Sequence, residues 1–323
     1  MRQPRRTIFI AVLLLGLHAS AQAQRPGAAP SAVEPVEAVQ LRPNFYLIGG
    51  AGGNIAVQTG SNGTLIVDTG TAEAAPRALA AIQKVTTEPI SLIINTSPDP
   101  EYVGGNAVIA KAGRQIFEGI PGLETAIFAH EKVLLGMSAP TGQTSAFPSD
   151  TWPTDTFAQA RKDLYFNREG VQIITVPAGH SDAASIVFFR ASDIVVAGKL
   201  IDATRFPVID LAKGGSVQAE IEGLNRVIDL ALRPIPFVDE GGGTYVIPGR
   251  GRVYDKVDVV EYRDMMVIIR DVVADMIKRG MTVEQVKAAR PAKAYETQYG
   301  SKTGPWTTDD FIAAVYASVK AGK

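Results

Sequence analysis

The stretch that decides the fold runs from residue 95 to residue 106 and reads Asn-Thr-Ser-Pro-Asp-Pro-Glu-Tyr-Val-Gly-Gly-Asn. It begins at the end of Ile90–Asn95, a largely apolar run that is typical of a strand buried on both faces. It ends at Gly104 and Gly105, where glycine suits the backbone geometry of a junction between a loop and a helix. Residues 106–112 then have the pattern of a short helix. The sequence therefore predicts a buried strand, a polar loop and a helix in direct succession.

Four other short motifs stand in a fixed order along the chain. Together with residues 95–106, they resemble the landmarks of the metallo-β-lactamase superfamily from about residue 40 to residue 252. In that family the loop usually reads Thr-His-x-His-x-Asp-His-x-Gly-Gly-Asn, and its two ends survive here at Thr96 and at residues 104–106. The resemblance implies an α+β fold, an αββα sandwich with the site at one edge of the two sheets. The four motifs are Thr64–Gly70, Pro177–Ser181, Val196–Lys199 and Val246–Gly251.

The chain departs from the family pattern at the metal ligands that this resemblance implies. Of the seven usual ligand positions, only that of His180 keeps its residue type. Apart from His180, the only histidine beyond residue 23 is His130, which we interpret as a surface or packing residue in a helix outside the motifs. The remaining ligand positions are occupied by Ser97, Asp99, Glu101, Tyr102, Lys199 and Arg250.

These replacements predict that zinc, the cofactor expected in the family, is absent. A catalytic zinc ion takes about three protein ligands, mostly histidine and carboxylate. A harder cation is the alternative, because Asp68, Asp99 and Glu101 could supply oxygen ligands. Lys199 and Arg250 argue against it, since their positive charges repel a cation and Arg is effectively always protonated. Our hypothesis is that these two cations pair with Asp99 and Glu101 and so replace the metal centre.

Three residues are candidates for catalysis, namely His180, Lys199 and Tyr102. A base role for His180 stays open, as does a packing role. Lys199 could act as a base or nucleophile if its pKa were lowered, whereas neighbouring carboxylates would keep it charged. Arg250 could belong to the ion-pair network or bind a carboxylate or phosphate on a ligand. The resemblance gives Asp68 a supporting role that orients the ligand loop, and Asp182 is close in sequence to His180.

Four segments are expected along the chain. Residues 1–23 form a signal peptide: a basic start is followed by the apolar run Ile8–Leu17 and by Ala21-Gln22-Ala23, with cleavage after Ala23. Residues 24–38 form a Pro- and Ala-rich disordered linker. Residues 39–254 form the sandwich, and residues 255–323 a C-terminal helical extension packed on it. We therefore expect a periplasmic or secreted protein with no membrane span after cleavage; the export route stays open.

The periodicity of hydrophobic residues predicts further elements. Residues 60–63 predict a hairpin turn, and residues 136–163 a long, largely irregular loop. On the first helix beyond Asp255, we expect Met265, Ile268, Ile269, Val272 and Met276 to form the buried face. Strands are expected at 54–58, 64–68, 115–118, 171–176, 185–189, 194–197 and 244–247, and helices at 72–85, 217–232, 282–290 and 307–319.

Net charge and composition exclude some classes of function. The net charge of −1 provides no basic field for nucleic acid, and the chain has no cysteine to form a disulfide or ligate a metal. The favoured hypothesis is an exported, metal-free degenerate hydrolase (a pseudoenzyme) that keeps a cleft for a small-molecule or anionic ligand, or for a partner near residues 147–157. The alternative is an active hydrolase of lactones, thioesters, β-lactams or esters with a non-standard metal or no metal. An assembly protein that dimerises through its C-terminal helices is a third option, and the oligomeric state stays open.

Overall fold

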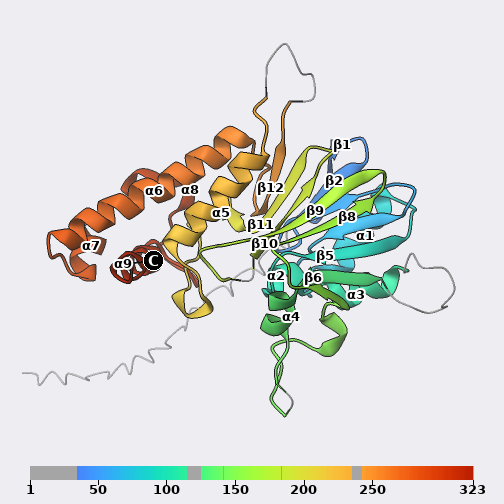
Figure 1. The fold of residues 1–323 in the computed structure, drawn as a ribbon, viewed down its shortest axis with the longest axis horizontal. Helices are drawn as coiled ribbons and strands as arrows, with labels where there is room; N and C mark the ends of the chain where they lie inside the picture. The colour runs from blue at the N-terminus through green and yellow to red at the C-terminus, as the bar shows by residue number, and fades with distance from the viewer. Residues whose placement is uncertain (1–34, 115–124, 141, 183, 235–241, 323) are drawn as a thin grey trace, which may run out of the picture. The chain divides into compact units, whose positions relative to one another are not determined.

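The computed structural model describes residues 35–114, 125–140, 142–182, 184–234 and 242–322. The strands of the first half of the described chain form one sheet in sequence order (Figure 1). Its first strands are antiparallel, and β4, β5, β6 and β7 run parallel to one another. These strands are β1 (Glu37–Arg42), β2 (Phe45–Gly49), β3 (Ile55–Gln58), β4 (Thr64–Val67), β5 (Ile90–Asn95), β6 (Ala126–His130) and β7 (Asp155–Phe157).

The second half forms the other sheet, in the order β12-β11-β10-β9-β8. Its strands pair antiparallel except for β11 and β12, which are parallel. Parallel strands need a crossover connection, and α5 (Val217–Leu230) provides this one. The strands are β8 (Arg161–Phe166), β9 (Glu169–Val176), β10 (Ala184–Phe189), β11 (Ile194–Asp202) and β12 (Tyr245–Arg250).

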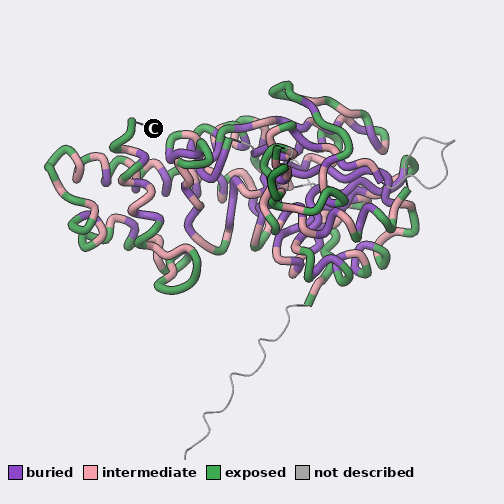
Figure 2. The backbone as a smooth tube through the Cα atoms, turned by 90° about the horizontal axis from the view of Figure 1, so that it is seen from below, coloured by how far each residue is buried: buried purple, intermediate pink, exposed green. Residues whose placement is uncertain are grey.

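Three hydrophobic clusters define four layers. One cluster lies between the sheets and contains Leu65 and Val67 of β4 together with Ile173 and Val187 of the other sheet. A second buries the outer face of the first sheet under α1 (Ala75–Val85) and α3 (Asn106–Ala112). A third buries the outer face of the second sheet under α5 and the C-terminal helices. Buried positions, purple in Figure 2, accordingly gather in the interior, and exposed positions, green, lie mostly at the outer turns of the tube. The αββα sandwich expected from the sequence is confirmed.

The C-terminal helical region packs on the outer side of α5 and belongs to the same compact unit as the sheets. Its long helix α6 (Lys256–Lys278) starts at Asp255, whose carboxylate accepts hydrogen bonds from the backbone in a capping box. Phe206, beyond β11, stacks on Phe311 with ring centroids 4.5 Å apart, which anchors the last helix. The other helices are α7 (Val283–Ala289), α8 (Glu296–Tyr299) and α9 (Thr308–Lys320).

The expected buried face of α6 was partly wrong. Met265 and Ile269 are buried as expected, but Ile268 and Val272 are exposed. Tyr262, Met266 and Val273 complete the buried face instead. The helix has apolar residues on more than one side, so periodicity alone did not identify the side that meets α5 and α9.

Other local differences concern the first half of the chain. His130 does not lie in a helix: it ends β6 and caps α4 (Glu131–Met137) through its Nδ1 atom. It is buried and packs edge-on against Phe157, so a packing role agrees with its position. Strand β7 crosses the stretch expected to be irregular, and β1 begins at Glu37, inside the expected linker. The strand expected at 115–118 and the signal peptide lie outside the described residues. No helix that the structure describes has the length and hydropathy to span a bilayer.

Candidate functional site: ion pairs between the two sheets

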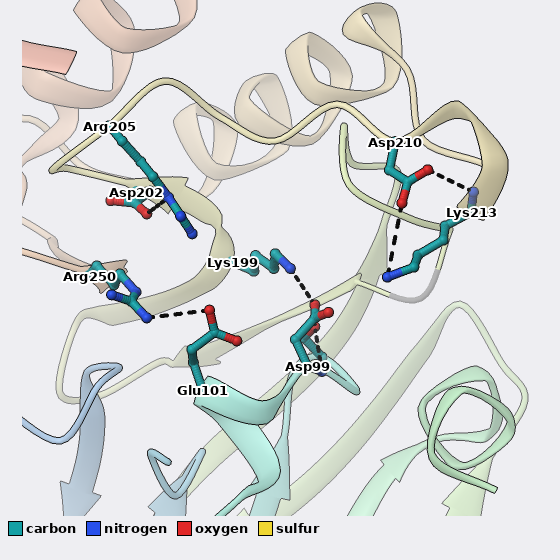
Figure 3. A network of polar contacts seen from close by, with 9 residues as sticks. Asp99, Glu101, Lys199, Asp202, Arg205, Asp210, Lys213 and Arg250 are labelled. Atoms are coloured by element: carbon teal, nitrogen blue, oxygen red, sulfur yellow. Dashed lines mark hydrogen bonds and ion pairs between the residues drawn. The ribbon is translucent and has the colours of Figure 1, made fainter. Parts of the chain in front are cut away.

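The candidate site lies at one edge of the sandwich, beside the C-terminal ends of β5, β11 and β12. The chain leaves β5 at Asn95 and enters the one-turn helix α2 (Pro100–Val103), which carries Glu101. Lys199 and Arg250 come from the other sheet, and Figure 3 shows both reaching toward the α2 segment. Backbone hydrogen bonds from Ser185 to Thr96 (3.0 Å) and from Asn54 to Gly249 (2.8 Å) join the sheets here.

Lys199 and Asp99 form the tighter ion pair. The Lys199 Nζ donates to Asp99 Oδ2 at 2.6 Å, and the Ser97 hydroxyl donates to the same oxygen at 2.7 Å. Both charged side chains are largely buried, with 17% and 16% of their surface exposed. Burial by itself would raise the pKa of Asp99, but the charge and hydrogen bond of Lys199 and the hydroxyl of Ser97 outweigh it, so the pKa lies below its ordinary value.

A bulge in β11 directs Lys199 to this position. The register of β11 against β12 shifts between Val196 and Gly198, and Gly198 has a left-handed φ of 52°. A Cβ at Gly198 would lie 2.4 Å from the Thr96 hydroxyl oxygen, so only glycine lets the Thr96 side chain pack this close to the backbone of β11. Bulges of this kind redirect the following side chain.

Arg250 and Glu101 form the second, looser pair. Arg250 Nη2 lies 3.3 Å from Glu101 Oε1, with 35% and 23% of the two side chains exposed. The end of β12 is held by Asn54, whose Nδ2 donates to the carbonyl oxygens of Pro248 and Gly251, both at 2.9 Å. The expected pairings of Lys199 and Arg250 with the carboxylates of the loop are therefore present in the structure.

His180 is buried beside these pairs. Its Nε2 atom has no hydrogen-bond partner within the described chain. Burial, and then the positive charge of Lys199, lower the pKa of His180 to about 3. The preceding residue, Gly179, donates its N–H at 2.6 Å to Glu220 of α5. Burial raises the pKa of Glu220 to about 8, so at neutral pH the imidazole is neutral and this acid is mostly protonated.

Asp68 and Asn106 fix the loop that carries the acidic residues. Asp68, at a left-handed φ of 61°, accepts hydrogen bonds from Thr96 N at 2.8 Å and Thr96 Oγ1 at 2.7 Å. This contact orients the start of the loop, and burial raises the pKa of Asp68 to about 7. Asn106 is more than a backbone junction: its buried amide donates to Asn95 Oδ1 and Thr151 O, both at 2.8 Å.

The other expected site residues lie in different surroundings. Tyr102 is buried in a small apolar cluster with Val103 and Val133, and burial raises its pKa well above the ordinary value. A Cβ at Gly249 would lie 2.2 Å from the Tyr102 hydroxyl oxygen, so this hydroxyl is close to the strand that carries Arg250. Asp182 is at the surface, where it pairs with Lys132 at 2.8 Å, and no described contact joins it to His180.

Several site residues were missed from the sequence. Asp202 follows Lys199 on β11 and binds Arg205 at 2.8 Å, and Figure 3 places this pair near Arg250. Glu220 comes from α5, and no local motif marks it. Asn54 was assigned only to a strand. The glycine-rich run at 49–53 that precedes it was a usable signal, because glycine lets one backbone segment pack closely against another.

The donor set does not fit the metal centre of the family. Among the residues that the structure describes, no three His, Cys, Asp or Glu side chains are grouped to hold a metal ion. More decisively, the oxygens of Asp99 and Glu101 face an ammonium and a guanidinium group. These cations cannot coordinate, and their charge opposes a cation at the same place.

The chain belongs to the metallo-beta-lactamase superfamily, whose sequence model matches residues 48–265. Solved structures agree in fold. The stereoselective inverting sec-alkylsulfatase Pisa1 from Pseudomonas sp. has a TM-score of 0.58 at 13% identity, with 87% of this chain and 50% of that chain covered. The metallo-beta-lactamase from Pontibacter korlensis has a TM-score of 0.53 at 14% identity, with 72% and 98% covered. The DIM-1 metallo-beta-lactamase has a TM-score of 0.52 at 12% identity, with 72% of this chain and 96% of that chain covered.

The alkylsulfatase similarity covers more of this chain than the lactamase similarity does. Residues 1–255 are about 79% of 323 residues, so a coverage of 87% must extend into the C-terminal helices. The chain spans about half the length of that alkylsulfatase. No curated protein matches the sequence.

Proposed function

We propose that this protein is an exported, metal-free degenerate hydrolase, a pseudoenzyme that keeps the cleft of its superfamily for binding a small anionic molecule. The observation that carries the proposal is the Lys199 Nζ at 2.6 Å from Asp99 Oδ2, inside a largely buried pair at a family ligand position. We also propose that the chain is periplasmic or secreted, after cleavage at Ala23.

Charge balance supports this proposal. Lys199 and Arg250 bring two positive charges to the site, and Asp99 and Glu101 bring two negative charges. Buried charges persist when they are paired and hydrogen-bonded, and both pairs meet this condition. The electrostatic role of metal ions in the superfamily would then be taken by two fixed organic cations.

The surrounding groups are poorly suited to acid–base catalysis. A base with a pKa of about 3, as His180 has, takes up a proton weakly at neutral pH. Tyr102 holds its proton even more firmly than a free phenol, because burial raises its pKa. The amine of Lys199 is engaged by Asp99 at 2.6 Å and is not free to attack a substrate as a nucleophile.

Metal analysis of the purified mature protein tests the proposal. After dialysis we expect far less than one equivalent of zinc, iron or manganese per chain, and no gain in tightly held metal after incubation with zinc. The matched control is a superfamily lactamase taken through the same steps, which should retain zinc. One or more equivalents of metal retained by this protein would overturn the proposal.

One observation favours the second candidate, an active hydrolase with a non-standard site. His180 presents a buried Nε2 atom that has no partner within the described chain, beside a charged pair. The test is turnover of lactone, thioester, β-lactam, sulfate-ester and phosphate-ester substrates, with and without chelator. Turnover that is lost in His180→Ala but kept in Lys132→Ala would establish this candidate; no turnover of any substrate would reject it.

A further inference from the structure

We propose that the hollow between the glycine-rich segment Gly49–Gly53 and Arg250 is an oxyanion-binding subsite for a sulfate or phosphate group. This inference rests on the proposed function and deepens it, because it gives the ligand a chemical class and a place. The subsite includes one former ligand position, that of Arg250, and combines its guanidinium group with backbone N–H groups.

The hollow has a volume of about 480 Å³. Arg250 is the one ionisable side chain among its described lining residues, so no carboxylate in the lining opposes an anion. Its lining residues are Gly49, Gly50, Gly52, Gly53, Asn54, Thr204, Arg250 and Gly251.

The glycine segment supplies unused hydrogen-bond donors. The backbone N–H groups of Gly50, Gly52 and Gly53 make no hydrogen bond to another described residue, although Gly53 is buried. Buried backbone donors are nearly always paired in folded proteins, so the N–H group of Gly53 calls for an acceptor, and the half-buried N–H groups of Gly50 and Gly52 lie next to it in the chain. Gly50 and Gly52 have φ values of 79° and 82°, and Ala51 between them does not have a positive φ. Alternation of this kind turns neighbouring N–H groups toward one concavity that suits an anion.

The segment is held against the strand that presents Arg250. A Cβ at Gly53 would lie 2.5 Å from the carbonyl oxygen of Glu101 and 3.5 Å from that of Gly249, so the backbones are in close contact. Asn54 then ties the segment to Pro248 and Gly251 on either side of Arg250. Asn54 is thus a positioning residue that keeps the N–H groups and the guanidinium on one rigid frame.

Arg250 keeps donors available for a ligand. One of its nitrogens contacts Glu101 at 3.3 Å, and its Nε and Nη1 atoms make no hydrogen bond within the described chain. Guanidinium groups bind phosphate and sulfate with paired, charge-assisted hydrogen bonds. A tetrahedral oxyanion has enough acceptor oxygens to meet these donors and the glycine N–H groups from different directions. The hollow is larger than a lone oxyanion, which leaves space for an organic group attached as a monoester.

Titration of the metal-analysed, full-length mature protein tests this subsite. The probes are inorganic sulfate, inorganic phosphate and phenyl phosphate, at ionic strength kept constant with chloride. We expect saturable binding by calorimetry that is at least tenfold weaker in Arg250→Gln and unchanged in the matched control Arg252→Gln. Arg252 lies two residues further on, pairs with Asp258 and is absent from the lining of the hollow. Tighter binding of phenyl phosphate than of inorganic phosphate would identify the group as part of a monoester.

A second measurement protects the test against misfolding of a variant. In the unaltered protein, the amide resonances of Gly50, Gly52 and Gly53 should shift with the same saturation curve as the calorimetric signal. Equal binding in Arg250→Gln, or glycine resonances that do not respond, would overturn the subsite. If the subsite fails in this way but metal analysis finds no retained metal, the proposed function still stands. Stoichiometric metal together with responsive glycines would overturn the proposed function and leave the subsite.

Discussion

Breaking the ion pair of Lys199 and Asp99 should destabilise the fold far more than breaking an exposed pair of the same type. In Lys199→Met the methionine fills a similar volume, but the Asp99 carboxylate loses its cation while it stays largely buried. An uncompensated buried charge is costly, whereas removal of both charges is often nearly neutral. We therefore expect the double variant Lys199→Met/Asp99→Asn to recover most of the lost stability.

The magnitude follows from the burial of the pair. Breaking a fully buried pair costs about 3–5 kcal/mol, and an exposed pair contributes about 0–1 kcal/mol. Because 17% and 16% of the two side chains are exposed, solvent screens part of the charge. We expect Lys199→Met to lower the free energy of unfolding by about 2–3 kcal/mol. The coupling energy between positions 199 and 99 should be about 1.5–3 kcal/mol.

Urea denaturation followed by circular dichroism gives these free energies by linear extrapolation. The matched control is the pair of Lys132 and Asp182, also Lys with Asp and 2.8 Å apart, but with 40% and 61% of the side chains exposed. The same double-variant cycle at these positions should give a coupling of at most about 1 kcal/mol. A coupling at 199 and 99 no larger than that of the control would refute the reasoning.

Substitutions at Arg250, Glu220 and Asn106 give three further predictions. Arg250→Gln should cost less than about 1 kcal/mol in urea denaturation, because its pair with Glu101 is longer and more exposed; a loss above about 2 kcal/mol would contradict this. Glu220 has a folded-state pKa of about 8, so the native state holds a proton that the unfolded state releases above pH 4.5. Its contribution to stability is present below that pH and is lost as pH rises toward 8, by at most about 1.4 kcal/mol per pH unit. Glu220→Gln should remove the Glu220 part of this decline in the free energy of unfolding measured from pH 5 to 9, and should leave the part below pH 7 that Asp68 contributes; an unchanged profile would disprove it. Asn106→Ala should cost about 2–4 kcal/mol, because the amide contacts of Asn95 and Thr151 lose their partner; a thermal melt equal to that of the parent would contradict this.

The sequence predicted the sheet framework because strand signals there are local. Residues 90–95 and 106–112 form the expected strand and helix with the expected bounds. The hairpin of β3 and β4 closes through a hydrogen bond from Gly63 to Gly60, as the turn residues require. In contrast, the buried face of α6 depended on which helices pack beside it, and periodicity alone did not determine it.

The ion pairs were predictable because the family motifs place Lys199, within β11, and Arg250, at the end of β12, opposite the loop that follows β5. Other parts of the site depended on long-range contacts. Glu220 is 41 positions from Gly179 along the chain, and burial of its carboxyl group raises its pKa. Asp182, near His180 in sequence, faces the surface and Lys132 instead. The role of Asn54 follows from the path of β12, which no local pattern reveals.

Anomalous diffraction from crystals of the mature protein, recorded at the zinc absorption edge, tests the central claim most directly. We predict no anomalous peak among Asp99, Glu101 and His180, with electron density joining the Lys199 ammonium to the Asp99 carboxylate at hydrogen-bond distance. A peak at this place, with the side chains of Lys199 and Arg250 turned away from the two carboxylates, would contradict the account.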